Sequence, residues 1–355
     1  MVLEVGEICR DIAAAEPPGE LVPYLVARQS LVMGDVEGGG DGEPVFVLPD
    51  LHLLSGDRHY EDYFHLNRRL KDRLMALLRR LEDLRATDPY RDMRVIQIGD
   101  FHDLWRERMH WWGEAVTTML DRQIESHHDL FDQLASLNCH RVVGNHDDTL
   151  ARKGVLASLR EHPISGYFPP GSIHTCPISL HRGVHGRVDL LHGHEVDPGE
   201  QRWWSRALNP IGCRFADPAL GIGATDEWQH ELLPDGTVDA MLDGPPFIYT
   251  PGVVDKTQGT NQKFYKELAD RMTCADDAPD ELRDRFRSAV VIGHTHHPRI
   301  VEGVDTCDYV LVDCGSWVNQ ATVVAQGDKQ VLRFWNGQLG ILSGPWAAVV
   351  QIGAS

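Results

Sequence analysis

Five short apolar runs in this chain each lead into residues of types that bind metal ions. Buried parallel strands read as continuous apolar runs, and open α/β sheets bind ligands beyond the carboxyl ends of their strands. We therefore expect the five endings to meet at one site. They are Val45–Leu48 before Asp50 and His52, Val95–Ile98 before Asp100, Val142 and Val143 before Asn145 and His146, Val188–Leu191 before His192 and His194, and Val290–Ile292 before His294 and His296.

These residue types together could hold two metal ions that hydrolyse a phosphate ester. Two divalent ions about 3.5–4 Å apart acidify a water and neutralise phosphoryl oxygens. Ions so close need an anionic ligand between them. Asp100 is the candidate, because it ends a strand and Gly99 lets the backbone turn tightly there. Imidazole and amide ligands complete the site without adding negative charge that would oppose an anionic substrate, and the candidates are His52, His192, His294, His296 and Asn145.

Two pairs of candidate ligands share a spacing that places both side chains on one side of the chain. Asp50 and His52 are two residues apart, and so are His294 and His296. Residues two apart in an extended segment project to the same side. We therefore expect each pair to face the same metal cluster.

Asp103 and His146 are the candidate acid pair. Asp103 lies three residues after Asp100, and His146 directly follows Asn145. A carboxylate that orients an imidazole and stabilises its protonated form makes that imidazole a general acid. We expect this pair to protonate the leaving oxygen.

The motifs, taken in order, resemble those of the calcineurin-like metallophosphoesterase superfamily. The resemblance covers about residues 45–195 and 289–335. It implies an α/β fold, a four-layer α/β/β/α sandwich with a cap insertion. It also implies hydrolysis of a phosphomonoester, phosphodiester or pyrophosphate by a metal-bound hydroxide at a binuclear site. The motifs are Asp-x-His from Asp50, Gly-Asp-x-x-Asp from Gly99, Gly-Asn-His-Asp from Gly144, His-Gly-His from His192 and Gly-His-x-His from Gly293.

The resemblance also implies a role for each motif residue. One metal ion would be bound by Asp50, His52, Asp100 and His296, and the second by Asp100, Asn145, His192 and His294, with His146 and Asp103 as the acid pair. Ligands rich in imidazole and carboxylate, without thiolate, suit Mn²⁺, Fe²⁺ or Zn²⁺ better than Mg²⁺ alone, and Mn²⁺ is the expected ion. The expected substrate is a phosphate-containing small molecule, for example a nucleotide or nucleotide sugar.

Within the superfamily, several segments look like the branch that contains UDP-2,3-diacylglucosamine pyrophosphohydrolase. They are Asp50–Leu53, Gly99–Trp105, Leu191–Asp197 and Gly293–Pro298. One position departs from that branch, in which arginine follows the motif asparagine. This chain has His146 there, which is the common residue of the superfamily.

Two other functions fit the motifs less well. A nuclease of the same superfamily is the narrower alternative, and the formal charge of −19 argues against a broad basic surface that would follow nucleic acid. A non-catalytic interaction scaffold that kept the fold would be expected to have lost ligands or acid residues. No such residue is missing from the motifs.

Several residues near the motifs have two interpretations. His102 could reach substrate or lie on the surface, and His194 could orient a neighbour or touch the phosphate. Asp147 is interpreted as a turn residue or a carboxylate behind the ligands, and His127 with His128 as part of an exposed helix face. The tryptophan pairs at 111–112 and 203–204 could stack a base or anchor a core, and Arg106, Arg202, Arg206 and Arg214 could bind phosphate or form surface ion pairs.

The elements that must position these residues follow from periodicity. Helical spacing predicts helices over Tyr60–Leu84, Glu114–Leu137 and Thr149–Arg160. Strands alternating with helices indicate a layered α/β domain. Further strands are expected at Tyr309–Val312, Thr322–Ala325 and Gln330–Trp335.

The domain organisation is read from changes in composition. Residues 1–44 are expected to form an N-terminal extension ending in the glycine-rich 38–42 segment. Residues 45–340 would form the metallophosphoesterase domain, with its core at 45–197 and 288–340 and a cap at about 198–287. Residues 341–355, which include Gly344 and Pro345, are interpreted as a packed C-terminal tail.

Composition sets the broad class of the protein. The chain has 355 residues, 42% of them hydrophobic and 25% charged, as in ordinary soluble globular proteins. Its seven cysteines are scattered and form no CxxC pair, which argues against a disulfide framework or a thiolate zinc site. The N-terminus lacks a basic start with an apolar core, and no apolar stretch reaches about 18 residues. We therefore expect a cytoplasmic protein.

Overall fold

The structure is a computed structural model in which most of the predicted core is described. The described residues are 5–13, 19–28, 43–55, 66, 68–105, 115–168, 171–174, 178–181, 187–194, 287–296, 298–302, 310–318, 320–326, 329–335, 337–344 and 346–353. The expected cap, apart from Arg287, lies outside these residues. So do both tryptophan pairs, the four candidate arginines and the glycine-rich segment at 38–42.

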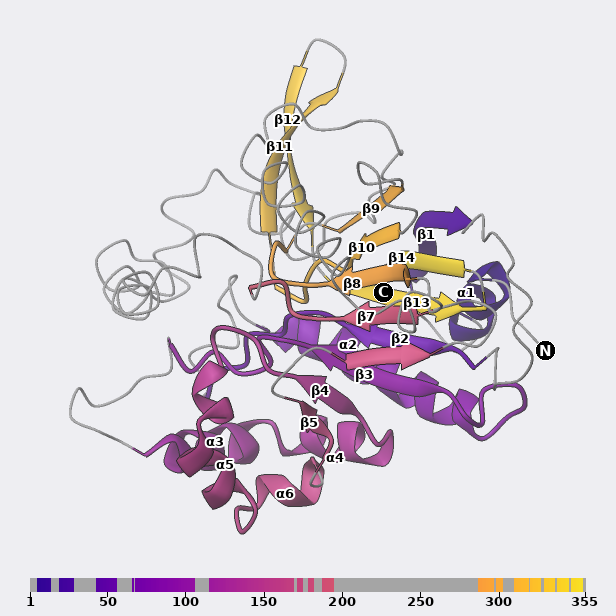
Figure 1. The fold of residues 1–355 in the computed structure, drawn as a ribbon. Helices are drawn as coiled ribbons and strands as arrows, with labels where there is room; N and C mark the ends of the chain where they lie inside the picture. Colours follow the sequence, from indigo (N-terminus) through magenta and orange to yellow (C-terminus); the bar gives the residue numbers. More distant parts are fainter. Residues whose placement is uncertain are drawn as a thin grey trace, which may run out of the picture.

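Two β-sheets form the centre of the molecule (Figure 1). The larger sheet has seven strands in the order β1 (Gly19–Arg28), β14 (Trp346–Gly353), β13 (Gln338–Ser343), β2 (Val45–Leu48), β3 (Arg94–Ile98), β4 (His140–Val142) and β5 (Ile173–His174). The smaller sheet has five strands in the order β6 (Ile178–His181), β7 (Arg187–Leu190), β8 (Arg287–Ile292), β10 (Val310–Asp313) and β9 (Arg299–Glu302). A separate antiparallel ribbon consists of β11 (Gln320–Gln326) and β12 (Lys329–Trp335).

The strands that lead into the candidate ligands run parallel within each sheet. In the larger sheet β2, β3 and β4 are parallel neighbours, and in the smaller sheet β7 and β8 are. Their carboxyl ends therefore share an edge, which is the arrangement expected from the five apolar runs.

The apolar runs are continuous because these strands are covered on both faces. Val45 and Val47 of β2 pack with strands of the smaller sheet in one apolar cluster. Phe46 and Leu48 belong to a second cluster that includes the helices. The α/β class is therefore confirmed, with two sheets packed face to face and helices against the larger one.

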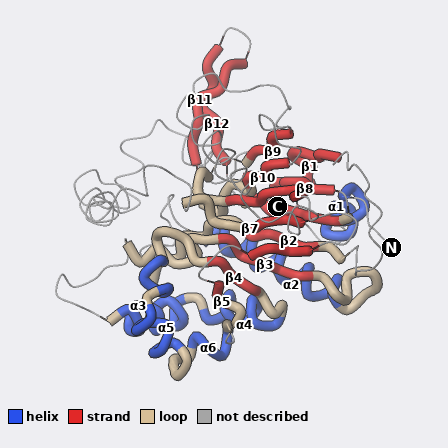
Figure 2. The backbone as a smooth tube through the Cα atoms, in the orientation of Figure 1, coloured by secondary structure: helices blue, strands red, loops and turns tan. Residues whose placement is uncertain are grey.

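The helices follow the expected segments with different ends. Within the predicted 45–197 core segment the first observed helix is α2 (Arg68–Arg85). The segment predicted as one helix over Glu114–Leu137 is two, α3 (Val116–Ser126) and α4 (His128–Ser136), because His127 leaves helical geometry with φ −130° and ψ 30°. A 3-10 turn, η2 (Asp148–Ala151), and helices α5 (Lys153–Leu159) and α6 (Ile164–Tyr167) follow, and Figure 2 shows α3 to α6 grouped beside β4 and β5.

Both ends of the described chain contribute to the larger sheet. Residues 341–355, interpreted as a tail, supply most of the β13–β14 hairpin, and β13 pairs with β2 through Gly340 opposite Val47. Gly344, with φ 50°, lies between the two strands, so its helix-breaking character marks a hairpin turn. β1 pairs with β14, and helix α1 (Val5–Ala13) packs its Ile8 and Ile12 into the core.

Candidate metal centre

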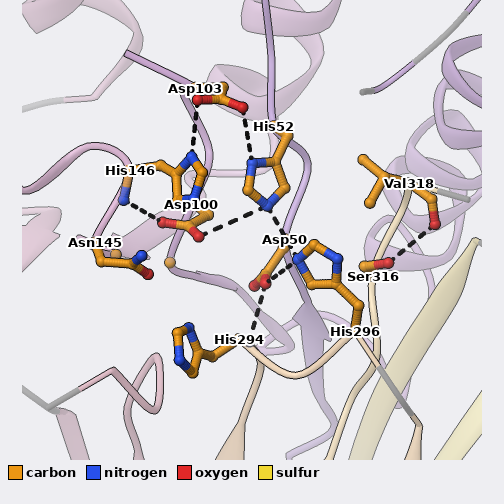
Figure 3. A network of polar contacts seen from close by, with 12 residues as sticks. Asp50, His52, Asp100, Asp103, Asn145, His146, His294, His296, Ser316 and Val318 are labelled. Atoms are coloured by element: carbon orange, nitrogen blue, oxygen red, sulfur yellow. Dashed lines mark hydrogen bonds and ion pairs between the residues drawn. The ribbon is translucent and has the colours of Figure 1, made fainter. Parts of the chain in front are cut away.

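The structure brings all nine predicted site residues together at the carboxyl ends of the parallel strands (Figure 3, in which all but His192 are labelled). Asp50, Asp100 and Asn145 follow strands of the larger sheet. His192 and the pair at 294 and 296 follow strands of the smaller sheet. The site therefore lies between the two sheets. The nine residues are Asp50, His52, Asp100, Asp103, Asn145, His146, His192, His294 and His296.

One group of donor atoms comes from Asp50, His52 and His296, whose ligand atoms all lie within 4.8 Å of one another. His296 Nε2 lies 3.1 Å from Asp50 Oδ2 and 3.0 Å from His52 Nε2. Asp50 is fully buried and His52 is 4% exposed. Two imidazole nitrogens and a carboxylate oxygen thus converge from both sheets.

A second group consists of Asp100, His192 and His294. His192 Nε2 lies 3.2 Å from Asp100 Oδ2 and 2.9 Å from Asn145 Oδ1. Asp100 Oδ2 is also 3.6 Å from His52 Nε2, in the first group. The same carboxylate oxygen therefore lies between the two groups, as a bridging ligand requires.

The donor set fits divalent transition ions. Burying carboxylates in this number is unfavourable unless they are paired or coordinate metals. Asp50 Oδ1 is buried and has no hydrogen-bond partner among the described residues. His52 Nδ1 lies 3.3 Å from Asp103 Oδ2, so a proton on Nδ1 leaves the Nε2 lone pair facing the donor cluster. Imidazole nitrogen and carboxylate oxygen are both common ligands of divalent metal ions in proteins.

Electrostatics within the cluster keep its carboxylates ionised. Burial would raise the pKa of Asp100, but His192 and His146 outweigh it and hold that pKa well below the usual value. Burial likewise opposes charge on His192, whereas Asp100 and Asp50 raise its pKa. Burial lowers the pKa of His52 to about 4, so its imidazole is neutral at pH 7 and able to bind a cation.

Three glycines allow the ligands to pack directly against the backbone of neighbouring loops. Only Gly99 among them has a left-handed φ, 78°. A side chain at any of them would displace a candidate ligand. A Cβ atom would lie 1.9 Å from His192 Nδ1 at Gly99, 2.2 Å from Asp100 Oδ1 at Gly144 and 2.4 Å from Asp50 Oδ1 at Gly293.

Four candidate ligands have a left-handed backbone. The φ angles are 47° at His52, 41° at Asp100, 69° at His294 and 58° at His296. The expectation that the two Asp-x-His and His-x-His pairs lie in extended segments is therefore wrong. Each pair still reaches the same cluster, because tight turns at the strand ends direct both side chains inward.

Asp103 lies between His52 and His146 (Figure 3). Its Oδ1 is 2.8 Å from His146 Nδ1, and its Oδ2 is the contact to His52. The backbone N–H of His146 donates to Asp100 Oδ1 at 2.8 Å. His146 is thus fixed beside the donor cluster with Nδ1 committed to Asp103, which is the arrangement of an oriented general acid.

A buried polar network behind the centre corrects the interpretation of His102. This side chain is neither on the surface nor in the cluster. It is fully buried, and its Nδ1 contacts Gln123 Oε1 while its Nε2 lies 2.8 Å from Arg141 Nη1. Arg141 is paired with Asp147, whose Oδ1 accepts the N–H of Gly144 at 2.7 Å.

The prediction that His127 lies on an exposed helix face is also wrong. It is 2% exposed, and its Nε2 lies 2.7 Å from the carbonyl oxygen of Leu54. His128 is exposed as expected and pairs with Asp132. The helix break at His127 explains the difference, because it turns this side chain inward.

Two supporting residues were missed in the sequence. Trp105 stacks on His146 with ring centroids 4.2 Å apart, and only its position two residues after Asp103 could have indicated it. Asp313 ends β10, a sixth apolar run. It accepts a hydrogen bond from Thr295 Oγ1, between the two ligands of that loop. The strand-end signal used for the other five runs applies there too. His194 is half-buried, with its ring centroid 5.3 Å from that of His192.

Comparisons with known proteins give only distant likenesses. No family model and no curated protein matches the sequence. Among solved structures, an uncharacterised protein from Streptococcus pneumoniae TIGR4, described as a predicted phosphoesterase, is 12% identical with a TM-score of 0.25, covering 86% of this chain and 91% of its own. A dimetal phosphatase from Danio rerio is 12% identical with a TM-score of 0.35, covering 89% and 100%. The evidence for a divalent metal site therefore comes from the clustered side chains of this chain.

No helix among the described residues has the length and apolar character to cross a membrane.

Proposed function

We propose that this protein is a metal-dependent hydrolase that cleaves a phosphomonoester, phosphodiester or pyrophosphate. The observation that carries the proposal is the position of Asp100 Oδ2, 3.6 Å from His52 Nε2 in one donor group and 3.2 Å from His192 Nε2 in the other. A carboxylate shared by two groups of donors is what a two-metal phosphoesterase site needs.

The proposed ligands divide between two ions. One ion would be bound by Asp50, His52, Asp100 and His296, and the other by Asp100, Asn145, His192 and His294. Mn²⁺ is the proposed ion, with Fe²⁺ or Zn²⁺ as alternatives, because the described donors are imidazole nitrogens and carboxylate or amide oxygens, with no thiolate among them. When bound, the ions would acidify a water and neutralise phosphoryl oxygens.

The chain's own residues would manage the leaving group. Asp103 holds Nδ1 of His146, so the transferable proton sits on Nε2 on the far side of the ring. His146 would give this proton to the leaving oxygen, a contribution of about 10²–10⁴-fold for a general acid. His52, held by the other oxygen of Asp103, keeps that carboxylate in place.

The proposed substrate is a small phosphate-containing molecule such as a nucleotide or nucleotide sugar. A formal charge of −19 disfavours long polyanions, which contact a broad surface. A small anion needs only the local positive field that divalent ions would supply.

The test compares Asp100→Asn with Asp92→Asn, which neutralises an exposed carboxylate beside β3. We expect Asp100→Asn to lose bound metal and at least about 100-fold in turnover, more than is typical for groups outside the ligand set. Asp92→Asn should match wild type. Metal content by plasma mass spectrometry and turnover of p-nitrophenyl esters are the measurements.

The substrate class follows from a panel assayed with Mn²⁺-loaded wild type. It contains p-nitrophenyl phosphate, bis-p-nitrophenyl phosphate, nucleotides and nucleotide sugars, with single- and double-stranded DNA to detect a nuclease. Protein that binds two ions per chain and cleaves none of these would contradict the proposal and favour a scaffold.

A further inference from the structure

Trp105 forms one wall of the acid pair. Its indole ring stacks on the imidazole of His146, with centroids 4.2 Å apart and planes inclined by 26°. Trp105 is 8% exposed and follows Asp103 by two residues in the same loop after β3. The loop that orients Nδ1 of His146 therefore also covers the flat face of its ring.

His146 is held from three directions. Asp103 Oδ1 lies 2.8 Å from Nδ1, and His52 meets the ring edge-on with centroids 4.6 Å apart and planes at 89°. Trp105 supplies the third contact, across the face. One hydrogen bond leaves a histidine ring able to swing, because its terminal torsion has a broad energy well. A flat aromatic neighbour narrows that range.

We propose that Trp105 is a positioning residue that fixes the plane of the His146 imidazole so that Nε2 points at the leaving oxygen. This inference rests on the proposed function. In the step concerned, a bond forms between phosphorus and the attacking water oxygen, and the bond to the leaving oxygen breaks. The proton on His146 Nε2 moves to the leaving oxygen, and a proton from the water passes to solvent.

A side chain that positions His146 and a side chain that merely fills space have different effects on catalysis. A space-filling role affects stability and all substrates alike. A positioning role affects only steps that need the proton, and small misplacements of a reacting group can cost about 10²-fold. Esters of phenol need protonation of the leaving oxygen far more than esters of p-nitrophenol do.

The experiment measures kcat and KM of Mn²⁺-loaded protein on phenyl and p-nitrophenyl esters of the same phosphate. We expect Trp105→Leu to lower kcat for the phenyl ester about 10–100-fold, within the range of a general acid, and to leave KM and metal content unchanged. For the p-nitrophenyl ester the loss should be under about 3-fold by the same reasoning. Trp105→Phe, which keeps a flat ring, should have most of the wild-type kcat for the phenyl ester.

The same substitutions in a His146→Ala background complete the test. There, Trp105→Leu should no longer change the preference between the two esters. Equal losses on both esters, or an undiminished effect without His146, would overturn the positioning role.

Failure of the proposed function would look different. In that case Mn²⁺-loaded wild type would hydrolyse neither ester. The orientation of His146 is then read by NMR from the exchange rate of its Nδ1 proton with water. We expect faster exchange in Trp105→Leu than in wild type and Trp105→Phe, and equal rates in all three would refute the proposal.

Discussion

The candidate ligands combine uncommon backbone angles with common side-chain chemistry. His52, Asp100, His294 and His296 all have positive φ angles, between 41° and 69°. Such conformations cost about 1–3 kcal/mol each for residues other than glycine and persist where surrounding structure enforces them. The motifs predict which residues are candidate ligands. They do not predict the backbone conformation, because two residues separated by one position can lie in an extended segment or in a turn.

Replacing His296 by glycine or by alanine tests this strain. Both remove the imidazole, but only alanine keeps the cost of φ 58°. We expect His296→Gly to be more stable than His296→Ala by about 1 kcal/mol in metal-free protein, measured by urea denaturation.

A control reverses the sign. At Asp132, exposed within helix α4, glycine should be less stable than alanine by about 1 kcal/mol. Equal stabilities of the two His296 variants would mean that the loop relaxes and stores no strain.

Among the elements, a buried ion pair joins strand β4, which contains Arg141, to the loop after it, which contains Asp147. Arg141 and Asp147 are both fully buried, and the Arg141 guanidinium lies 4.7 Å from the Phe101 ring centroid. Asp147 in turn accepts the N–H of Gly144. The pair therefore supports the turn that presents Asn145 and His146.

Removing one partner should cost more than removing both. Arg141→Met leaves the Asp147 carboxylate buried without its cation, and we expect a loss of about 3–5 kcal/mol in the free energy of unfolding. The double variant Arg141→Met/Asp147→Leu should recover part of that loss in denaturant titrations. Additive losses would show that the pair is not energetically coupled.

A histidine pair on β4 and β5 should make stability depend on pH. His140 Nδ1 lies 3.0 Å from His174 Nε2. Burial lowers the pKa of both below the usual 6.5, and Arg94 adds to this at His140 and His140 adds to it at His174. As pH falls, the unfolded chain therefore binds protons at these histidines before the folded chain does. Stability is fully retained above about pH 7, and the free energy of unfolding decreases as pH falls below 6.5. The variant His140→Gln/His174→Gln should show a smaller fall in stability between pH 7.5 and 5.5, about two units around the usual histidine pKa. An unchanged slope in urea titrations would contradict this.

Elements were predictable to different degrees. The strands of the parallel core are predictable, because burial on both faces requires continuous apolar sequences such as Val45–Leu48. The division of one predicted helix at His127 was not, because the apolar period continues through it. The β13–β14 hairpin is harder to predict, because Gly344 and Pro345 indicate an end of regular structure, whereas in sequence they separate two paired strands.

The two ends of the described chain pack against one core. Ile8 and Ile12 of α1 are buried, and Tyr90 Oη donates to Asp11 Oδ2 at 2.7 Å. The two-sheet arrangement was available only through the resemblance, since no local pattern states which strands of two sheets face each other. The part of residues 1–44 in α1 belongs to this packing.

Shortening a buried side chain of α1 should therefore destabilise the entire domain. We expect Ile12→Ala to lower the free energy of unfolding by about 2–5 kcal/mol, because it leaves a cavity beneath the helix. Glu7→Ala, at an exposed position of the same helix, should change it by less than about 0.5 kcal/mol. An Ile12→Ala protein with wild-type stability in denaturant titrations would show that α1 is dispensable.

The ligand loops are separated widely along the chain, from Asp50 to His296, and β2 hydrogen-bonds to β13 at Gly340. Two of the four candidate imidazole ligands, His294 and His296, are thus synthesised more than 240 residues after Asp50. Strand β13, which pairs with β2, follows later still in the sequence. A complete set of donors would therefore assemble only after strands of both sheets exist, so the proposed ions would be bound late in folding.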